Sequence, residues 1–229
     1  MQVKNLTVSF IVPVYNEERH IGGFLQSLID QTLFEVEGYD SNVILVDGNS
    51  SDKTLDIARD FMSNHGNVDF RILNNDLKIV PISMNMGIME TNSDIIVRMD
   101  VHALYPKCYA QTLINFLVKN KDSNVVNVGA PIQTIPGDSS KIALAIASIM
   151  SSSLGVGSSF RSTKARKGFS YVDTVPFGCF WRADLIKIGI FDEEMVRNQD
   201  DELNWRLKRS GGLIALIPMD NFLYFSRTS

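Results

Sequence analysis

The sequence predicts an α/β protein with a mostly parallel central sheet flanked by helices. Apolar, strand-like stretches alternate with helix-like stretches through the first two-thirds of its 229 residues. With 45% hydrophobic and 21% charged residues, the chain is apolar enough to bury a large core. Because strands that alternate with helices usually pair in parallel through right-handed crossovers, this pattern indicates a doubly covered, Rossmann-like sheet.

The elements follow in order. Strands are expected at residues 7–14, 42–46, 70–73, 94–99 and 124–128, and helices at 17–31, 52–64, 82–91 and 109–120. Asn16 is the expected cap of the first helix. After Pro131 the pattern is less regular, with helices expected at 142–153, 182–188 and 200–209 and a strand at 171–175. A Gly, Ser and basic stretch at 155–168 predicts a loop.

Polar residues follow three of the predicted strands, in the motifs at 13–17 (PVYNE), 47–52 (DGNSSD) and 100–102 (DVH). Ligands of parallel sheets bind at the carboxyl ends of the strands. A carboxylate such as Asp47 at that edge suits a ribose or base, with Gly48 allowing close approach. An ordinary turn with Asp52 as helix cap is the structural alternative.

Asp100 and His102 are candidate metal ligands. In an extended chain, residues two apart point to the same side, so the carboxylate and the imidazole are expected to share one cation. The carboxylate suits Mg²⁺ or Mn²⁺, and the imidazole favours Mn²⁺. A surface aspartate beside a hydrogen-bonded histidine is the alternative.

Three carboxylates at 200–202 open a predicted helix. The helix dipole stabilises the ionised form, whereas neighbouring like charges raise a carboxyl pKa. That combination suits a general base that deprotonates a hydroxyl. A capping cluster on a solvated helix is the alternative interpretation.

Other features exclude classes of function. The net charge of −4 argues against bulk nucleic-acid binding. Cys108 and Cys179 fit reduced thiols, and thiol catalysis is disfavoured because no convincing histidine partner accompanies them. No stretch reaches the roughly 18–20 apolar residues of a membrane span. Basic residues at 161–167 suggest either contact with a diphosphate or lipid surface, or a solvated loop.

Together the motifs resemble inverting family 2 glycosyltransferases with a GT-A fold, in particular the bacterial succinoglycan-biosynthesis branch. The residues that carry the resemblance lie at 11–18 (IVPVYNEE), 46–54 (VDGNSSDKT), 96–102 (IVRMDVH), 173–180 (DTVPFGCF) and 197–204 (RNQDDELN). The resemblance spans nearly the whole chain. It implies transfer of a sugar, with UDP the expected nucleotide, to a glycan or lipid-linked acceptor in exopolysaccharide or cell-surface polysaccharide synthesis.

The resemblance also implies a role for each matching residue. The nucleotide-binding residues would be Pro13, Tyr15, Glu17, Asp47, Asp52, Lys78 and Asp100. Asp100 and His102 would hold Mn²⁺ or Mg²⁺, although His102 departs from the commoner Asp-x-Asp pattern. Asp200 would be the catalytic base, with Asp201 as its rival. Gly178 and Cys179 would line the sugar–acceptor region.

A single domain is expected, with residues 1–130 binding the donor and 131–229 carrying the acceptor side and the base. We expect the full protein to extend beyond residue 229, and the enzyme to work in the cytoplasm at the inner membrane face. Two other functions stay open: an inactive nucleotide-binding scaffold and a sugar nucleotidyltransferase. The second would prefer a Gly-rich, basic phosphate loop after the first strand, which the 13–17 motif is not.

Overall fold

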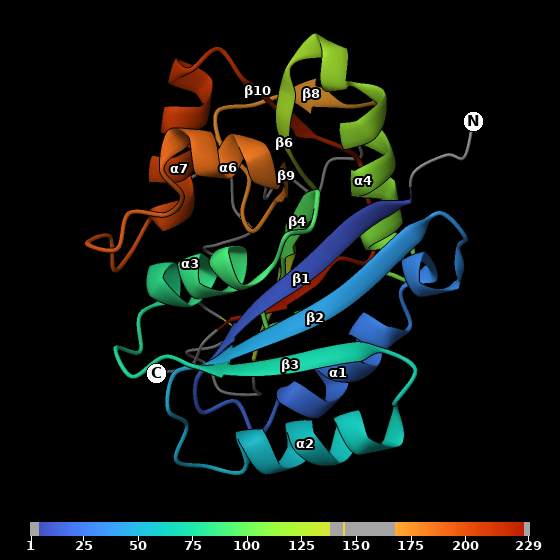
Figure 1. Cartoon of the computed structure of the whole chain (residues 1–229), viewed down its shortest axis with the longest axis vertical. Helices are drawn as coiled ribbons and strands as arrows, with labels where there is room; N and C mark the ends of the chain where they lie inside the picture. The colour runs from blue at the N-terminus through green and yellow to red at the C-terminus, as the bar shows by residue number, and fades with distance from the viewer. Residues whose placement is uncertain (1–4, 138–143, 145–167, 227–229) are drawn as a thin grey trace.

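The computed structural model describes residues 5–137, 144 and 168–226 (Figure 1). Its main feature is an eight-stranded sheet with the order β3-β2-β1-β4-β9-β6-β10-β8. The strands are β1 (Leu6–Val14), β2 (Tyr39–Asp47), β3 (Asp69–Asn74), β4 (Ile95–Arg98), β6 (Val125–Gly129), β8 (Ser170–Tyr171), β9 (Cys179–Trp181) and β10 (Leu213–Leu216). All but β8 and β9 run in the same direction, which confirms the mostly parallel sheet.

Helices cover both faces of this sheet, with α1, α2 and α4 on one side and α3, α6 and α7 on the other (Figure 1). The helices are α1 (Ile21–Ile29), α2 (Thr54–Asn64), α3 (Val80–Glu90), α4 (Tyr109–Lys119), α6 (Arg182–Ile188) and α7 (Gln199–Arg209), with short 3₁₀ helices η1 (Thr32–Glu35) and η2 (Lys121–Ser123). In β1, Phe10 packs in the α1 cluster and Ile11 in the α3 cluster. A strand buried on both faces therefore carries a continuous apolar run, which in β1 spans residues 10–14.

A second sheet has three short strands. It has the order β5-β11-β7, from β5 (Ala103–Leu104), β11 (Leu223–Phe225) and β7 (Gln133–Ile135). The N–H of Phe225 donates to the carbonyl of His102 at 2.8 Å. This sheet therefore fastens the last described strand to the turn that follows β4.

Several elements differ from the sequence prediction. The first helix begins at Ile21 and not at residue 17, because Asn16 is left-handed (φ 53°) and caps no helix. The β1–α1 loop is longer as a result. The predicted strand at 171–175 is reduced to Ser170–Tyr171. The short strands β5, β7, β9, β10 and β11 were not predicted.

Parts of the prediction fall outside the described residues. These are the helix at 142–153, apart from Leu144, and the basic stretch at 161–167. Among the described residues, no helix is both long enough and apolar enough to cross a bilayer.

Candidate functional site

A cavity of about 120 Å³ opens at the carboxyl ends of β1, β2 and β4. Five residues predicted to bind a nucleotide line it: Pro13, Tyr15, Glu17, Lys78 and Asp100. Val14, Gly48, Val80, Ser83, Arg98 and Val101 complete the lining. The structure therefore brings together the segments that sequence reasoning placed at this edge of the sheet.

Hydrogen bonds between two loops shape the cavity wall. Ser50 Oγ accepts from the N–H of Asn16 at 2.9 Å, and Asn16 Oδ1 accepts from the N–H of Ser51 at 2.8 Å. The N–H of Gly48 donates to the carbonyl of Val14 at 2.8 Å. A Cβ on Gly48 would lie 3.2 Å from the Cβ of Tyr15, so a larger residue would crowd this wall.

Asp47 and Asp52 build these loops and are not among the residues that line the cavity. Asp47 is buried, and its two oxygens accept from the N–H and the hydroxyl of Ser50. Asp52 accepts from the N–H and hydroxyl of Thr54 and from the N–H of Glu18. The turn interpretation of this motif thus describes the contacts that both carboxylates make, whereas the N-cap residue of α2 is Lys53 and not Asp52.

Tyr15 and Lys78 form the exposed rim. The Lys78 ammonium lies 5.2 Å from the centroid of the Tyr15 ring. Lys78 has a left-handed backbone (φ 62°), which costs free energy in a residue with a Cβ. An aromatic face and a cation side by side suit a nucleobase and a phosphate, respectively.

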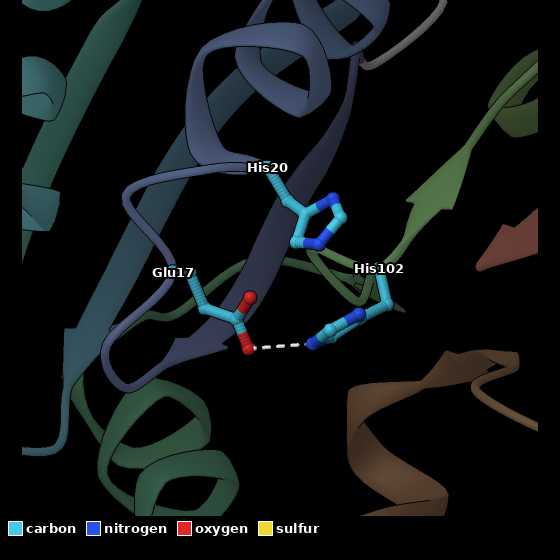
Figure 2. A group of neighbouring side chains, drawn as sticks. All are labelled: Glu17, His20 and His102. Carbon is cyan, nitrogen blue, oxygen red and sulfur yellow. Dashed lines mark hydrogen bonds and ion pairs between the residues drawn. The ribbon is translucent and has the colours of Figure 1, made fainter. Parts of the chain in front are cut away.

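Asp100 and His102 do not lie in an extended segment, as the sequence argument assumed. The chain turns after β4, and Asp100 Oδ1 accepts from the backbone N–H of His102 at 2.9 Å. Asp100 lines the cavity. The His102 ring contacts Glu17 and His20 (Figure 2). The physical reason is the turn, which removes the two-residue alternation on which the shared-face argument depended.

The side chains of Glu17, His20 and His102 converge, and one ligand atom from each lies within 4.8 Å of the others (Figure 2). The Nε2–H of His102 donates to Glu17 Oε1 at 2.8 Å, and the centroids of the two imidazoles are 4.7 Å apart. Burial lowers the pKa of His20, as does His102, which favours the neutral imidazole. Sequence reasoning missed His20, although its spacing of three residues from Glu17 places both in one turn.

Arg98 connects the cavity to the candidate base and was also missed. It lines the cavity, is 4% exposed, and its Nη1 makes an ion pair with Asp200 Oδ1. The guanidinium lies between the rings of Phe177 and Phe191, 5.6 and 5.8 Å from their centroids. A buried arginine on an otherwise apolar strand was the available signal, because such a charge is stable only when it is paired.

Asp200 and Asp201 occupy different environments at the start of α7. The side chain of Asp200 is 20% exposed, and burial raises its pKa while the Arg98 guanidinium opposes that shift. Asp201 and Asp100 raise the pKa of Asp200 further. Asp201 is exposed, and its Oδ1 accepts from the Thr174 hydroxyl at 2.7 Å. Asp200 is therefore the inward carboxylate of the two.

Gly178 and Cys179 are both buried. Gly178 is left-handed (φ 96°), and its carbonyl accepts from the N–H of Arg98 at 3.0 Å. Cys179 is fully buried in β9, and burial raises the pKa of its thiol. Both residues thus support the strand that carries Arg98, and the buried thiol is unsuited to nucleophilic chemistry.

A larger hollow, of about 420 Å³, lies at the amino ends of β1, β2 and β3. Thr7, Asp40 and Asp69 belong to its lining. It contains none of the motif residues, so size alone does not identify the site.

The chain resembles proteins of known activity. Residues 9–181 match the family model described as Glycosyl transferase family 2. The chain is 28% identical over 227 residues to a dolichyl N-acetyl-alpha-D-glucosaminyl phosphate 3-beta-D-2,3-diacetamido-2,3-dideoxy-beta-D-glucuronosyltransferase of Methanococcus voltae, covering 97% of this chain and 68% of that protein. It is 29% identical over 221 residues to the succinoglycan biosynthesis protein ExoA of Rhizobium meliloti (strain 1021), covering 95% and 62%.

Two solved structures share the fold. TarS 1-349 of S. aureus in complex with UDP-GlcNAc has a TM-score of 0.69 and 16% identity, covering 98% of this chain and 60% of that chain. The mannosyltransferase PcManGT of Pyrobaculum calidifontis, in complex with GDP-Man and Mn²⁺, has a TM-score of 0.68 and 18% identity, covering 96% and 57%. These likenesses confirm the predicted GT-A fold. The present chain spans 57–68% of the length of these four relatives.

Proposed function

The chain belongs to glycosyl transferase family 2, and from that premise we propose that it moves a sugar from a nucleotide-sugar donor to a saccharide hydroxyl with inversion. The observation that carries the proposal is the position of Arg98, which lines the cavity and pairs with Asp200. One buried side chain thereby joins the cavity at the edge of the sheet to a carboxylate suited to general-base catalysis.

The donor nucleotide is proposed to bind in the cavity, with its base against Tyr15 and a phosphate near Lys78. Gly48 leaves room for the nucleoside to approach the backbone. UDP is the proposed nucleotide, since S. aureus TarS has been solved with UDP-GlcNAc. GDP is the alternative to test, because PcManGT has been solved with GDP-Man.

Asp200 is the proposed base, and Asp201 is its rival. The Asp200 carboxylate takes the proton of the acceptor hydroxyl as that oxygen attacks the anomeric carbon. The bond between the anomeric carbon and the diphosphate breaks on the opposite face, and the nucleoside diphosphate leaves with the electron pair. One displacement of this kind inverts the anomeric configuration and needs no covalent enzyme intermediate.

A divalent cation, Mn²⁺ or Mg²⁺, is part of the proposal. When bound, such an ion offsets the charge that grows on the leaving diphosphate. The residues fit a cation in this respect: Asp100 lines the cavity, and carboxylate oxygens are ligands that Mn²⁺ and Mg²⁺ accept. Asp100 is the proposed cavity ligand. The His102 ring, the second predicted ligand, contacts Glu17 and His20.

The acceptor is proposed to be a glycan or a lipid-linked saccharide, in exopolysaccharide or cell-surface polysaccharide synthesis. The relatives support this, one being named a succinoglycan biosynthesis protein and another acting on a dolichyl-linked sugar phosphate. We further propose that residues 1–130 bind the donor and that residues 131–229 carry the acceptor side and the base. The sugar and the acceptor are proposed to lie near Gly178 and Cys179. The enzyme is proposed to work at the inner face of the membrane.

The proposal is tested by a screen of UDP-, GDP- and dTDP-sugars for donor hydrolysis and thermal stabilisation, with and without Mn²⁺ or Mg²⁺. We expect one nucleotide class to stabilise the chain and its sugar to be released only when metal is present. Stabilisation without turnover on any donor or acceptor would favour the nucleotide-binding scaffold. If none of the nucleotides stabilises the chain, the proposed donor site is wrong.

A further inference from the structure

We propose that Glu17, His20 and His102 form a binding site for a first-row transition ion, of the Zn²⁺, Co²⁺ or Mn²⁺ class, at one wall of the cavity. The metal motif at 100–102 predicts Asp100 and His102 as ligands and includes neither Glu17 nor His20. The inference does not depend on sugar transfer, since it concerns binding of the ion by the chain itself.

The backbone holds two of the three groups in place before any ion binds. The carbonyl of Glu17 accepts from the N–H groups of His20 (3.0 Å) and Ile21 (2.9 Å), which closes a turn at the start of α1. The N–H of Glu17 donates to Thr54 Oγ1 at 2.6 Å. His20 occupies the N-cap position of α1, but its side chain makes no capping hydrogen bond.

The third group arrives on a different element. His102 follows β4 in the turn before β5, and its carbonyl is fixed by the N–H of Phe225. Figure 2 shows the two imidazoles and the Glu17 carboxylate facing a common space. An ion there would join the β1–α1 loop to the turn after β4.

The His102 ring supplies an independent indication of a ligand. His102 is 9% exposed, and its Nδ1 atom is buried without a hydrogen-bond partner in the described part of the chain. Leaving a buried polar atom unpaired destabilises the fold, so native structures rarely retain one without a reason. A coordinated ion would supply that partner.

The chemistry of the donors selects the ion. Two neutral imidazoles and one carboxylate suit Zn²⁺, Co²⁺ and Mn²⁺, whereas Mg²⁺ prefers an all-oxygen octahedral shell. Three protein ligands leave at least one coordination position for water or another oxygen ligand. Glu17 also lines the cavity, so the ion would fix the position of one cavity residue.

Direct metal binding tests the site without any assay of transfer. The chelator-treated full chain is titrated with Co²⁺, whose visible absorption reports the coordination number, and then with Zn²⁺ in competition. We expect one Co²⁺ per chain, the intense bands of a four- or five-coordinate ion, displacement by Zn²⁺ and no displacement by an equal concentration of Mg²⁺. Absence of a stoichiometric spectrum, or displacement by Mg²⁺, overturns the proposal.

Variants identify the ligands. His20→Gln should weaken Co²⁺ binding by at least about tenfold, since even outer-shell changes reach that size. His65→Gln is the matched control, because the His65 ring bonds the Phe61 carbonyl away from the cluster. The affinity of this variant for Co²⁺ should not change. Asp100→Asn should also keep its affinity for the ion. Loss of binding in Asp100→Asn with retention in His20→Gln would assign the ion to the motif pair and overturn the inference.

Circular dichroism and thermal unfolding of each variant without metal check that the variant is folded. The half-buried His20 is the primary substitution, and Glu17→Gln is the second variant should His20→Gln fail to fold. Failure of the ion site would leave nucleotide binding and transfer intact as separate measurements, so the two proposals fail independently.

Discussion

Asp200 and Asp201 are neighbours in sequence that meet different surroundings. Asp200 is turned inward to a buried arginine, whereas Asp201 is exposed and bonded to Thr174. Since only a carboxylate within reach of the acceptor hydroxyl acts as base, the inward residue is the stronger candidate. The sequence places three carboxylates in this turn, but cannot say which of them faces the sheet.

The corresponding prediction is that Asp200→Asn lowers kcat by about 10²–10⁴-fold, the usual contribution of a general base. Asp201→Asn should lower it by less than tenfold and serves as the matched control. Steady-state transfer kinetics with both variants checks this, with nucleotide affinity measured separately by calorimetry. If Asp201→Asn is inactive and Asp200→Asn is active, Asp201 and not Asp200 is the catalytic base.

The pH dependence of transfer should report the same carboxyl. Burial raises the pKa of Asp200 above its ordinary value of 3.8, Arg98 opposes that shift, and Asp201 adds to it. A base works as the carboxylate, so activity is lost as pH falls through the pKa of Asp200. We expect the acid limb of kcat/KM above pH 3.8, and expect Asp201→Asn to move it to lower pH. An acid limb that does not respond to Asp201→Asn would contradict this coupling.

At the scale of elements, β9 links the two halves of the main sheet. It pairs antiparallel with both β4 and β6, and Gly178 immediately before it bonds the backbone of Arg98. A Cβ on Gly178 would lie 2.6 Å from the Phe180 ring, and its φ of 96° already disfavours other residues. The glycine is thus required by the fold that positions the candidate base.

We therefore predict that Gly178→Ala lowers the free energy of unfolding by at least about 2 kcal/mol, from backbone strain and overpacking. Gly23→Ala is the matched control. Gly23 is exposed inside α1, and a Cβ added there would meet no atom within 4 Å. This change should therefore raise the free energy of unfolding by about 0.5–1 kcal/mol. Urea unfolding followed by circular dichroism measures both. Equal effects in the two variants would refute the structural role of Gly178.

The elements also show where sequence reasoning succeeds. Apart from the two-residue β5 and the start of α1, the strands and helices through residue 129 follow from apolar patterning, because a doubly covered strand such as β1 carries a continuous apolar run at 10–14. The short β9 was missed because three residues carry too little pattern, and its partners are distant in sequence. The start of α1 was misplaced because Asn16 adopts a left-handed turn in which it bonds the neighbouring loop.

The candidate site was predictable in location but not in contacts. Topology places strand ends at one edge of the sheet, so Tyr15 and Asp100 were expected near each other. The direction of the His102 ring depends on a turn, and the Arg98–Asp200 pair joins residues 102 positions apart. Neither is encoded in local pattern, because both arise from tertiary packing.

At the scale of the whole molecule, the cavity is lined by four separate segments of the chain and therefore couples ligand binding to folding. A ligand that binds only the folded chain at 100 times its Kd stabilises it by about 2.7 kcal/mol. For a chain of this size, that corresponds to a rise in Tm of about 5–10 °C. We expect UDP, with Mn²⁺ present, to produce a rise of this size.

The contribution of Lys78 to UDP binding can be separated from the effect of the overall charge of the protein. Lys78→Ala removes a cation at the cavity rim beside Tyr15, so the UDP-induced rise in Tm should shrink because the affinity falls. Lys119→Ala is the matched control, since it removes an exposed lysine at the end of α4, which contributes nothing to the cavity lining. Differential scanning fluorimetry over a range of UDP concentrations gives both affinities. If the two variants keep the same UDP affinity as the unaltered chain, the nucleotide does not contact Lys78, and its proposed orientation in the cavity is wrong.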